Sequence, residues 1–258
     1  MERVDPDWWK TLFDETYLIT DARTVCDDGL TCREVDFLER LLELKESWPI
    51  LDLCGGHGRH SLELSRRGFQ DVTVLDYSKV LIDLGRKMAQ KESLNTLFMR
   101  RDARQTGLPG QRFKVIIVMA SSFGYFVDEG ENEKILREAF RLLKPKGSLF
   151  LDLPHREYVL KNFRPQSWHE ASDEIVVCRK KRLDEDVVCG REMVISKTWG
   201  MIRDSTYCTR LYSPEKITKM LRSAGFASVR IHKNFVSHEE EGDYGLMTNR
   251  MIVIADKK

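Results

Sequence analysis

Short apolar runs alternate with longer segments of helical period along the first 155 residues of the chain. The runs, four to seven residues long, have the length of single strands. Such alternation predicts a parallel sheet with helices on both faces. The predicted strands are Ile50–Leu53, Val72–Leu75, Thr96–Met99, Phe113–Met119 and Ser148–Leu153.

Residues that favour helix ends lie between these strands. Thr31 and Glu34 have the spacing of a capping box. Ser78 is a suitable N-cap for a helix over Lys79–Gln90, and Gly68 is expected to end an earlier helix. These signals support helices as the connections.

The pattern changes to β-rich alternation between Asp173 and Thr209, with Asp184–Asp186 as a polar turn. Several short strands joined by turns are typical of antiparallel pairing. We therefore expect a small antiparallel sheet inserted within residues 165–210.

Residues 211–258 are expected to complete the main sheet. Ser213 is a good N-cap, Pro214 suits the first helical position, and Gly225 is expected to end that helix. Two strands, Ser228–His232 and Met251–Ala255, are predicted to follow. The predicted fold class is α/β: a doubly wound, mostly parallel, seven-stranded sheet with the inserted antiparallel sheet, all within one domain over 1–258.

An aromatic, amphipathic segment, Trp8–Leu18, precedes the first strand. Its simplest interpretation is a helix that packs Trp8, Leu12 and Phe13 on the core. The functional interpretation is a lid over a ligand, formed within residues 1–47.

Composition and charge narrow the class of protein. The chain of 258 residues is 41% hydrophobic, enough to bury a sizeable core. Its 42 lysines and arginines against 41 acidic residues leave a net charge of +1, which gives no electrostatic case for nucleic acid or an anionic membrane. The six cysteines form no C-x-x-C pair, and no signal-like or membrane-spanning segment is evident. We expect reduced thiols and a cytoplasmic protein.

A glycine-rich turn follows the first predicted strand, within the run Ile50–His60. Asp76 ends the next strand, where its carboxylate can accept hydrogen bonds from both hydroxyls of a ribose. A dinucleotide dehydrogenase would have a third glycine where this chain has Ser61. The turn and Asp76 together predict a nucleoside-binding site of another type.

The turn resembles the D-x-G-x-G-x-G motif of class I S-adenosylmethionine-dependent methyltransferases. Asp52 comes first, Cys54 stands in place of the first glycine, and Gly56 and Gly58 follow. The resemblance implies the Rossmann-like methyltransferase fold, with the cofactor-binding half in residues 48–155.

Further runs are similar to one subgroup of that family. Ser121–Phe126 reads S-S-F-G-Y-F after the fourth predicted strand, and Phe13–Leu18 matches an F-D-E-x-Y-L lid helix. The subgroup also has a β-rich insertion after the fifth strand, which corresponds to the sheet predicted here.

The resemblance implies S-adenosyl-L-methionine as the cofactor and suggests its contacts. It places Asp76 on the ribose, Tyr77 against the adenine and Asp102 at the adenine amino group, and Tyr77 and Met119 can sandwich the adenine. Glycines let the turn approach the cofactor closely. The predicted cofactor-binding residues are Tyr17, Asp52, Gly56, Gly58, Arg59, His60, Asp76, Tyr77, Asp102, Ala103 and Met119.

Methyl transfer is an in-line displacement, so the protein chiefly aligns acceptor, methyl group and sulfur, which can lower the barrier by about 7–11 kcal/mol. A general base is needed only for an acceptor that arrives protonated. The candidate catalytic residues are Tyr125 and His155. Tyr17 and Tyr125 could face a cationic group, and core packing explains each tyrosine equally well. His155 is equally explained as an ordinary loop histidine.

Cys54, His57 and His60 have a C-x-x-H-x-x-H spacing, but a structural zinc site needs four ligands and no fourth is evident. We therefore expect no metal. Arg59 could instead pair with the cofactor's carboxylate, and His60 could orient the turn or cover that end.

The acceptor is expected to be a small molecule, because the charge is near neutral and an aromatic lid and insertion could enclose it. Methylation of RNA or protein is the alternative, although Ala120–Phe123 lacks an N-P-P-Y-type motif. An NAD(P)-dependent oxidoreductase would rest on the Y-x-x-x-K spacing of Tyr212–Lys216, and a non-catalytic nucleoside-binding module is a further class. The sequence leaves the acceptor atom, the use of a general base and the oligomeric state undefined.

Overall fold

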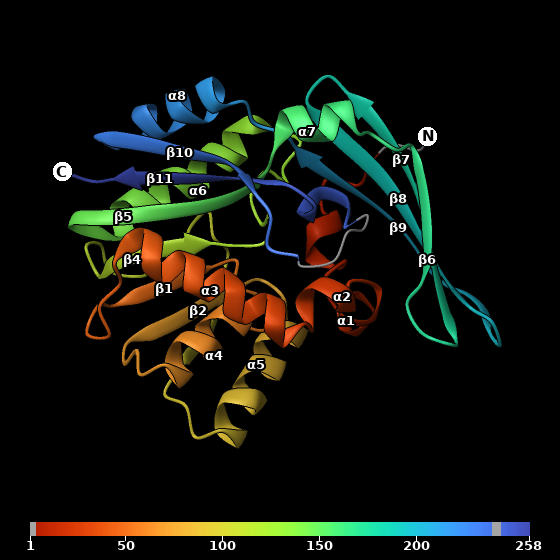
Figure 1. Cartoon of the computed structure of the whole chain (residues 1–258), viewed down its shortest axis with the longest axis horizontal. Coiled ribbons are helices and arrows are strands. Elements are labelled where there is room, and N and C mark those ends of the chain that lie inside the picture. The colour runs from red at the N-terminus through yellow and green to blue at the C-terminus, as the bar shows by residue number, and fades with distance from the viewer. Residues whose placement is uncertain (1–3, 239–243) are drawn as a thin grey trace.

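The computed structural model describes residues 4–238 and 244–258 and contains two sheets (Figure 1). The central sheet has seven strands in the order β10-β11-β5-β4-β1-β2-β3. Its strands are β1 Ile50–Leu53, β2 Val72–Asp76, β3 Leu97–Arg100, β4 Phe113–Val118, β5 Leu143–Pro154, β10 Ser228–Phe235 and β11 Arg250–Asp256.

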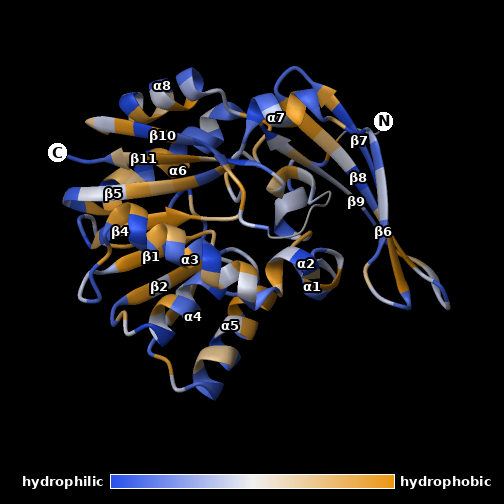
Figure 2. Cartoon of the chain, viewed as in Figure 1, coloured by the Kyte–Doolittle hydropathy of each residue, from blue (hydrophilic) through white to orange (hydrophobic). Residues whose placement is uncertain are grey.

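Helices cover both faces of the central sheet. Leucines and other apolar residues of α3 and α4 join one buried cluster, those of α6 and α8 join another, and α5 packs on β2 and β3. Figure 2 shows the matching hydropathy, with apolar residues along the central strands and polar residues on the outer sides of the helices. These helices are α3 Asp28–Leu42, α4 Arg59–Arg66, α5 Lys79–Lys91, α6 Glu129–Leu142 and α8 Pro214–Ala224.

The strand order places a ligand site at the ends of β1, β2 and β4. β1 pairs in parallel with both β2 and β4. The strands β2 and β3 lie on one side of β1, and β4 and β5 lie on its other side. Open α/β sheets bind ligands in the crevice beyond the carboxyl ends of such strands. The fold class predicted from the sequence is confirmed.

The second sheet, called the insertion sheet below, is antiparallel with the order β6-β7-β8-β9. It follows the short helix α7 (Arg156–Lys161) and lies beside the central sheet, with α1 (Glu15–Thr20) and α2 (Ala22–Val25) near the gap between them (Figure 1). Its strands are β6 Gln166–Glu170, β7 Ile175–Asp184, β8 Val187–Ser196 and β9 Gly200–Arg210.

The predicted capping box at Thr31 and Glu34 is wrong. Asp27 is the N-cap of α3, because its carboxylate accepts from the Leu30 N–H at 2.8 Å. Both predicted residues therefore lie inside the helix, and Glu34 is fully buried. The caps predicted at Ser78, Ser213 and Gly225 are confirmed.

The N-terminal aromatic segment is not one continuous helix. A 3₁₀ turn, η1 (Trp8–Lys10), is separated from α1 by residues without helical structure. Asp14 starts α1, because its carboxylate accepts from the N–H groups of Thr16 and Tyr17. A second 3₁₀ turn, η2, spans Gly245–Met247.

Candidate active site

The glycine turn after β1 is tightly packed. Cys54 has a φ of 64°, in the left-handed region that glycine normally occupies. At Gly58, where φ is 76°, a Cβ would lie 2.8 Å from the Phe98 ring. At Gly55 a Cβ would lie 2.5 Å from the Asp52 carboxyl carbon. At Gly55 and Gly58 the turn can follow this path only without a side chain.

Asp76 lies directly beside the turn. Its Oδ2 accepts from the Gly56 N–H at 2.8 Å, and its Oδ1 accepts from the Ser78 N–H at 2.8 Å. Burial raises the pKa of the Asp76 carboxyl above its usual value. The structure therefore brings together the turn and the carboxylate that the sequence assigned to one nucleoside site.

Two adjoining cavities open at this point. The first is bordered by the turn, Arg59 and Met119, and the second by Tyr77 and Asp102. Residues that line both are Phe13, Cys54, Asp76, Ser122 and Tyr125. Eleven of the predicted site residues line one or both cavities: Tyr17, Asp52, Gly56, Arg59, His60, Asp76, Tyr77, Asp102, Ala103, Met119 and Tyr125.

Two predicted site residues line neither cavity. Gly58 is the N-cap of α4. His155, at the end of β5, is buried with its Nδ1 3.0 Å from Asn249 Oδ1. The structure therefore does not bring His155 to the site, and we do not assign it a catalytic role.

Tyr77 and Met119, which the sequence predicts to sandwich the adenine, line different members of the two adjoining cavities. Tyr77 packs edge-on against Trp9, with ring centroids 4.7 Å apart. Trp9 and Phe126 also line the second cavity. Sequence reasoning missed both, since aromatic residues are ordinary core residues.

Asp52 is fully buried at the end of the first cavity. Burial raises the pKa of its carboxyl to about 7. Its Oδ2 accepts from the Ser61 hydroxyl at 2.9 Å, whereas Oδ1 has no hydrogen-bond partner among the described residues. A buried acceptor without a partner is costly, and a bound ammonium group would satisfy it.

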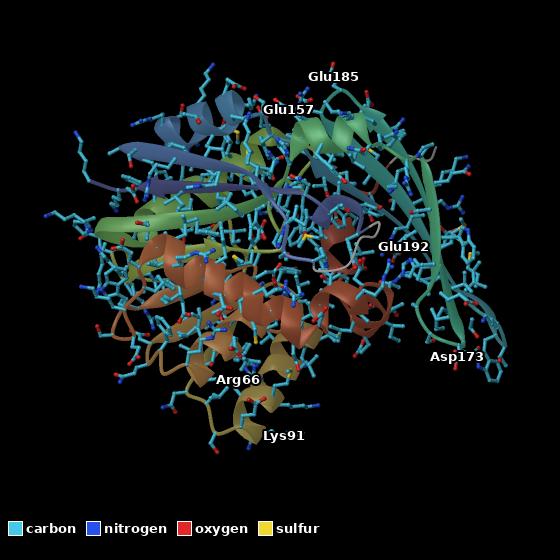
Figure 3. The ribbon with its side chains drawn as sticks, in the orientation of Figure 1. Arg66, Lys91, Glu157, Asp173, Glu185 and Glu192 are labelled. Atoms are coloured by element: carbon cyan, nitrogen blue, oxygen red, sulfur yellow. The ribbon has the colours of Figure 1, made fainter. Side chains whose placement is uncertain are left out.

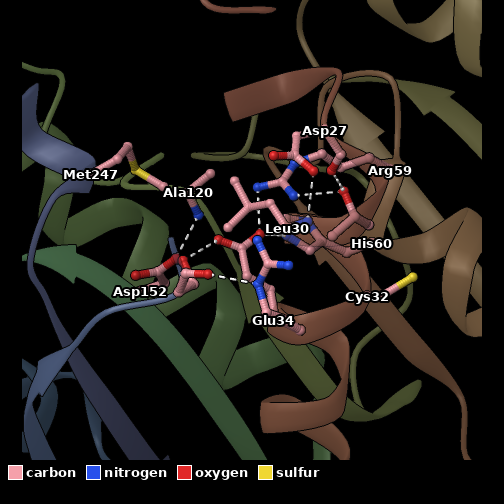
Figure 4. A network of polar contacts seen from close by, with 12 residues as sticks. Asp27, Leu30, Cys32, Glu34, Arg59, His60, Ala120, Asp152 and Met247 are labelled. Carbon is pink, nitrogen blue, oxygen red and sulfur yellow. Dashed lines mark hydrogen bonds and ion pairs between the residues drawn. The ribbon is translucent and has the colours of Figure 1, made fainter. Parts of the chain in front are cut away.

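Arg59 and His60, at the start of α4, share one buried carboxylate (Figure 4). Glu34 Oε2 lies 2.6 Å from Arg59 Nη2 and 2.8 Å from His60 Nε2. Arg59 also donates to the Thr31 hydroxyl at 2.9 Å. Burial and the Arg59 charge lower the pKa of His60 to about 4, so its imidazole is neutral at pH 7.

The polar network continues across the sheet through Arg250 of β11. Its guanidinium lies 2.5 Å from Glu34 Oε1 and 2.5 Å from Asp152 Oδ2, and the side chains of all three residues are inaccessible to solvent. Asp152 also accepts from the Ala120 N–H at 2.9 Å, at the edge of the first cavity. Ala120 and Ser121 have φ values of 54° and 58°. Sequence reasoning did not find this network.

Tyr125 lies under the aromatic N-terminal segment. Its ring stacks on Phe13 with centroids 5.5 Å apart and meets Trp8 edge-on at 5.1 Å. Burial raises the pKa of the Tyr125 phenol further above neutrality. The phenol therefore stays protonated and can donate a hydrogen bond, but it is a poor general base.

Comparisons with known proteins agree with this geometry. The sequence model of a family described as a methyltransferase domain matches residues 50–147. The putative methyltransferase YqeM of Bacillus subtilis (strain 168) is 27% identical over 202 residues, covering 76% of this chain and 80% of that protein. Glycine/sarcosine N-methyltransferase of Aphanothece halophytica is 23% identical over 217 residues, covering 82% and 79%. The protein is an S-adenosylmethionine-dependent methyltransferase.

The fold of the methyltransferase agrees with that of solved relatives. The crystal structure of an S-adenosylmethionine-dependent methyltransferase from Clostridium acetobutylicum ATCC 824 superposes with a TM-score of 0.73 at 16% identity. The match covers 94% of this chain and 96% of that one. The cofactor predicted from the sequence is confirmed.

The residues at the site fit this cofactor. The partnerless Asp52 oxygen suits its ammonium group, Arg59 borders the same cavity and suits its carboxylate, and Gly55 and Gly56 line that cavity without a Cβ. The Tyr212 and Lys216 pair of the oxidoreductase hypothesis lies elsewhere. Tyr212 is buried in the core, and Lys216 pairs with Glu129 at 2.6 Å.

Within residues 4–238 and 244–258, no group of three or more histidine, cysteine or acidic residues is arranged to hold a metal ion. In the same part of the chain, no helix has the length and apolarity to cross a membrane.

Proposed function

We propose that the methyltransferase transfers a methyl group to a small-molecule acceptor that binds beneath the N-terminal segment. The observation that carries this proposal is the position of Phe13 and Tyr17, which come from that segment and line the cavities. A folded macromolecule would have to displace the segment to reach the space below it. The glycine/sarcosine relative also has a small acceptor in its name.

The cofactor contacts follow from the two cavities. Asp76 would hold the ribose, Tyr77 and Asp102 would hold the adenine in the second cavity, and Asp52 and Arg59 would hold the amino-acid end in the first. Asp102 is itself oriented by Arg104, at 2.6 Å. Bound S-adenosylmethionine supplies an electrophilic methyl group on a sulfonium.

The protein's own contribution is orientation and exclusion of water. The aromatic residues Phe13 and Tyr125 line both cavities, and Tyr17 lines the first. Neutral His57 and His60, whose pKa values are lowered to about 4, are weak bases at pH 7. We infer that the acceptor binds in its nucleophilic, deprotonated form, so turnover increases with pH until the acceptor is fully deprotonated.

A fractionation experiment tests the acceptor class. The full chain is incubated with methyl-labelled S-adenosylmethionine and a cell extract separated into metabolites, RNA and protein. Label in the metabolite fraction, absent with Asp76→Ala, supports a small-molecule acceptor. Label only in RNA or in protein overturns it and assigns that macromolecule as the acceptor. Binding of S-adenosylhomocysteine by the wild type checks that the preparation is competent.

A further inference from the structure

Helix α1 is attached to the insertion sheet at both of its ends. Asp14, the N-cap, pairs with Arg203 of β9, whose Nη2 also donates to the Leu12 carbonyl at 3.0 Å. Asp21, the C-cap, pairs with Arg179 of β7 at 2.8 Å. The helix between the two caps is only six residues long, so its own hydrogen bonds give it little independent stability.

One buried carboxylate joins the two arginines. Glu192 of β8 lies 2.7 Å from Arg179 and 3.4 Å from Arg203, and its side chain is 5% exposed. Figure 3 shows Glu192 within the insertion sheet, between the ends marked by Asp173 and Glu185. The ion pairs form on one face of the sheet, because Arg179 is registered opposite Glu192 and strand residues alternate between faces. We call Arg179, Glu192 and Arg203 the arginine clamp.

The helix held by the clamp borders the cofactor site directly. Tyr17 of α1 lines the first cavity, and Phe13, one residue before the N-cap, lines both. The Phe13 carbonyl accepts from the Ser78 hydroxyl at 2.6 Å. Ser78 follows the ribose candidate Asp76 by two residues and donates its N–H to it. Movement of α1 would therefore remove side chains from both cavities.

We propose that Arg179, Glu192 and Arg203 are positioning residues that hold α1 over the cofactor and so control how tightly the cofactor is retained. The inference rests on the proposed function, which places the cofactor in these cavities. None of the three residues lines either cavity, so each acts through α1. The insertion sheet thereby contributes to catalysis at the central sheet without touching the cofactor.

The test compares Arg179→Met and Arg203→Met with a matched control in the full chain. The control is Arg191→Met, which breaks an Arg191–Asp204 ion pair between neighbouring strands of the same sheet. Arg191 is adjacent to Glu192, so its side chain is on the opposite face. For the clamp variants we expect the dissociation constant and dissociation rate of S-adenosylhomocysteine to rise about tenfold, as loss of a charged hydrogen bond implies.

If the clamp acts by holding α1 over the cofactor, its loss should weaken cofactor binding more than it slows the chemical step. KM for S-adenosylmethionine should rise about tenfold, with the single-turnover rate at saturating cofactor changed much less. Arg203→Lys should restore part of the affinity. Equal KM and dissociation rates in the clamp and control variants overturn the proposal. So does an affinity loss fully explained by unfolding, which a thermal melt of each variant detects.

Hydrogen exchange separates this inference from the cofactor assignment. Without any ligand, amides of residues 15–21 should exchange faster in Arg203→Met than in Arg191→Met. If the wild type binds no S-adenosylhomocysteine but this difference is present, the clamp holds and the cofactor assignment fails. If the exchange rates are equal, the clamp does not position α1.

Discussion

At the scale of single residues, the site depends on glycines where a side chain would clash and on a buried carboxylate oxygen without a hydrogen-bond partner. Gly58 and Gly56 both have positive φ, but only Gly58 faces a close neighbour, Phe98. The sequence motif predicted the glycines and Asp76 because their spacing is local. It could not predict Glu34, since an acidic residue inside a helix usually faces solvent and its partner Arg250 is 216 residues away.

We predict that Gly58→Ala destabilises the protein by about 2–5 kcal/mol. Its Cβ would meet Phe98 at 2.8 Å, so crowding of about 1–3 kcal/mol adds to a left-handed backbone cost of about 1–2 kcal/mol. Gly56→Ala is the control, because φ is 59° there and the nearest atom is 3.4 Å away. Urea denaturation without cofactor measures both. Equal losses would show that packing at Phe98 contributes nothing.

We predict that cofactor binding releases a proton from Asp52. Burial places its pKa at about 7 without ligand, so the carboxyl is largely protonated at pH 6. A bound ammonium favours the carboxylate, so affinity should rise as pH increases from 5 to 7 and level off above. Calorimetry with S-adenosylhomocysteine in buffers of different ionisation enthalpy counts the protons. A variant Asp52→Asn that keeps the same pH dependence would contradict the assignment.

At the scale of elements, hydrophobic period and capping residues predicted the strands, the insertion sheet and several helix ends. Ser78 and Ser213 were recognised because a cap needs only a local side chain and a following helix. The break before α1 was missed, since the aromatic stripe of Trp8, Leu12 and Phe13 continues across it. There Asp14 and tertiary contacts to β9 override the helical pattern.

We predict that Ser78→Ala lowers both stability, by about 1 kcal/mol, and affinity for S-adenosylhomocysteine. Ser78 accepts from the Leu81 N–H at 3.2 Å and donates to the Phe13 carbonyl, so it caps α5 and holds the N-terminal segment. Ser213→Ala is the control, since Ser213 caps α8 through the Lys216 N–H, also at 3.2 Å. It should lose similar stability and no affinity. Parallel affinity losses would leave the Ser78–Phe13 bond without a role.

At the scale of the whole molecule, a network of buried polar and charged groups joins α3, α4, β5 and β11. Glu34 and Asp152 share Arg250, and the network ends at Arg59 and His60 beside the first cavity (Figure 4). Sequence patterns predicted the layers of the fold, because these follow from local periods. They could not predict which polar residues meet inside it, because those contacts form only when distant segments pack.

We predict that Arg250→Met destabilises the protein by about 3–5 kcal/mol, because it leaves the buried Asp152 carboxyl without its cation and removes one of the two arginines that pair with Glu34. Adding Glu34→Gln should cost less than it does in the wild type, since the Arg250 guanidinium that this change would leave unpaired is then already absent. A double-mutant cycle by urea denaturation gives the coupling energy. Strict additivity would mean that the two groups do not stabilise each other.

The Glu34–Arg250 pair also constrains the order in which the protein matures during synthesis. Its acidic member is translated 216 residues before its basic member, so in a ribosome-bound fragment without β11 only Arg59 and His60 are available to pair with that glutamate. We expect such fragments to leave α3 undocked and unable to capture S-adenosylmethionine. The protein would then become able to transfer methyl groups only at the end of synthesis, when β11 pairs with β5.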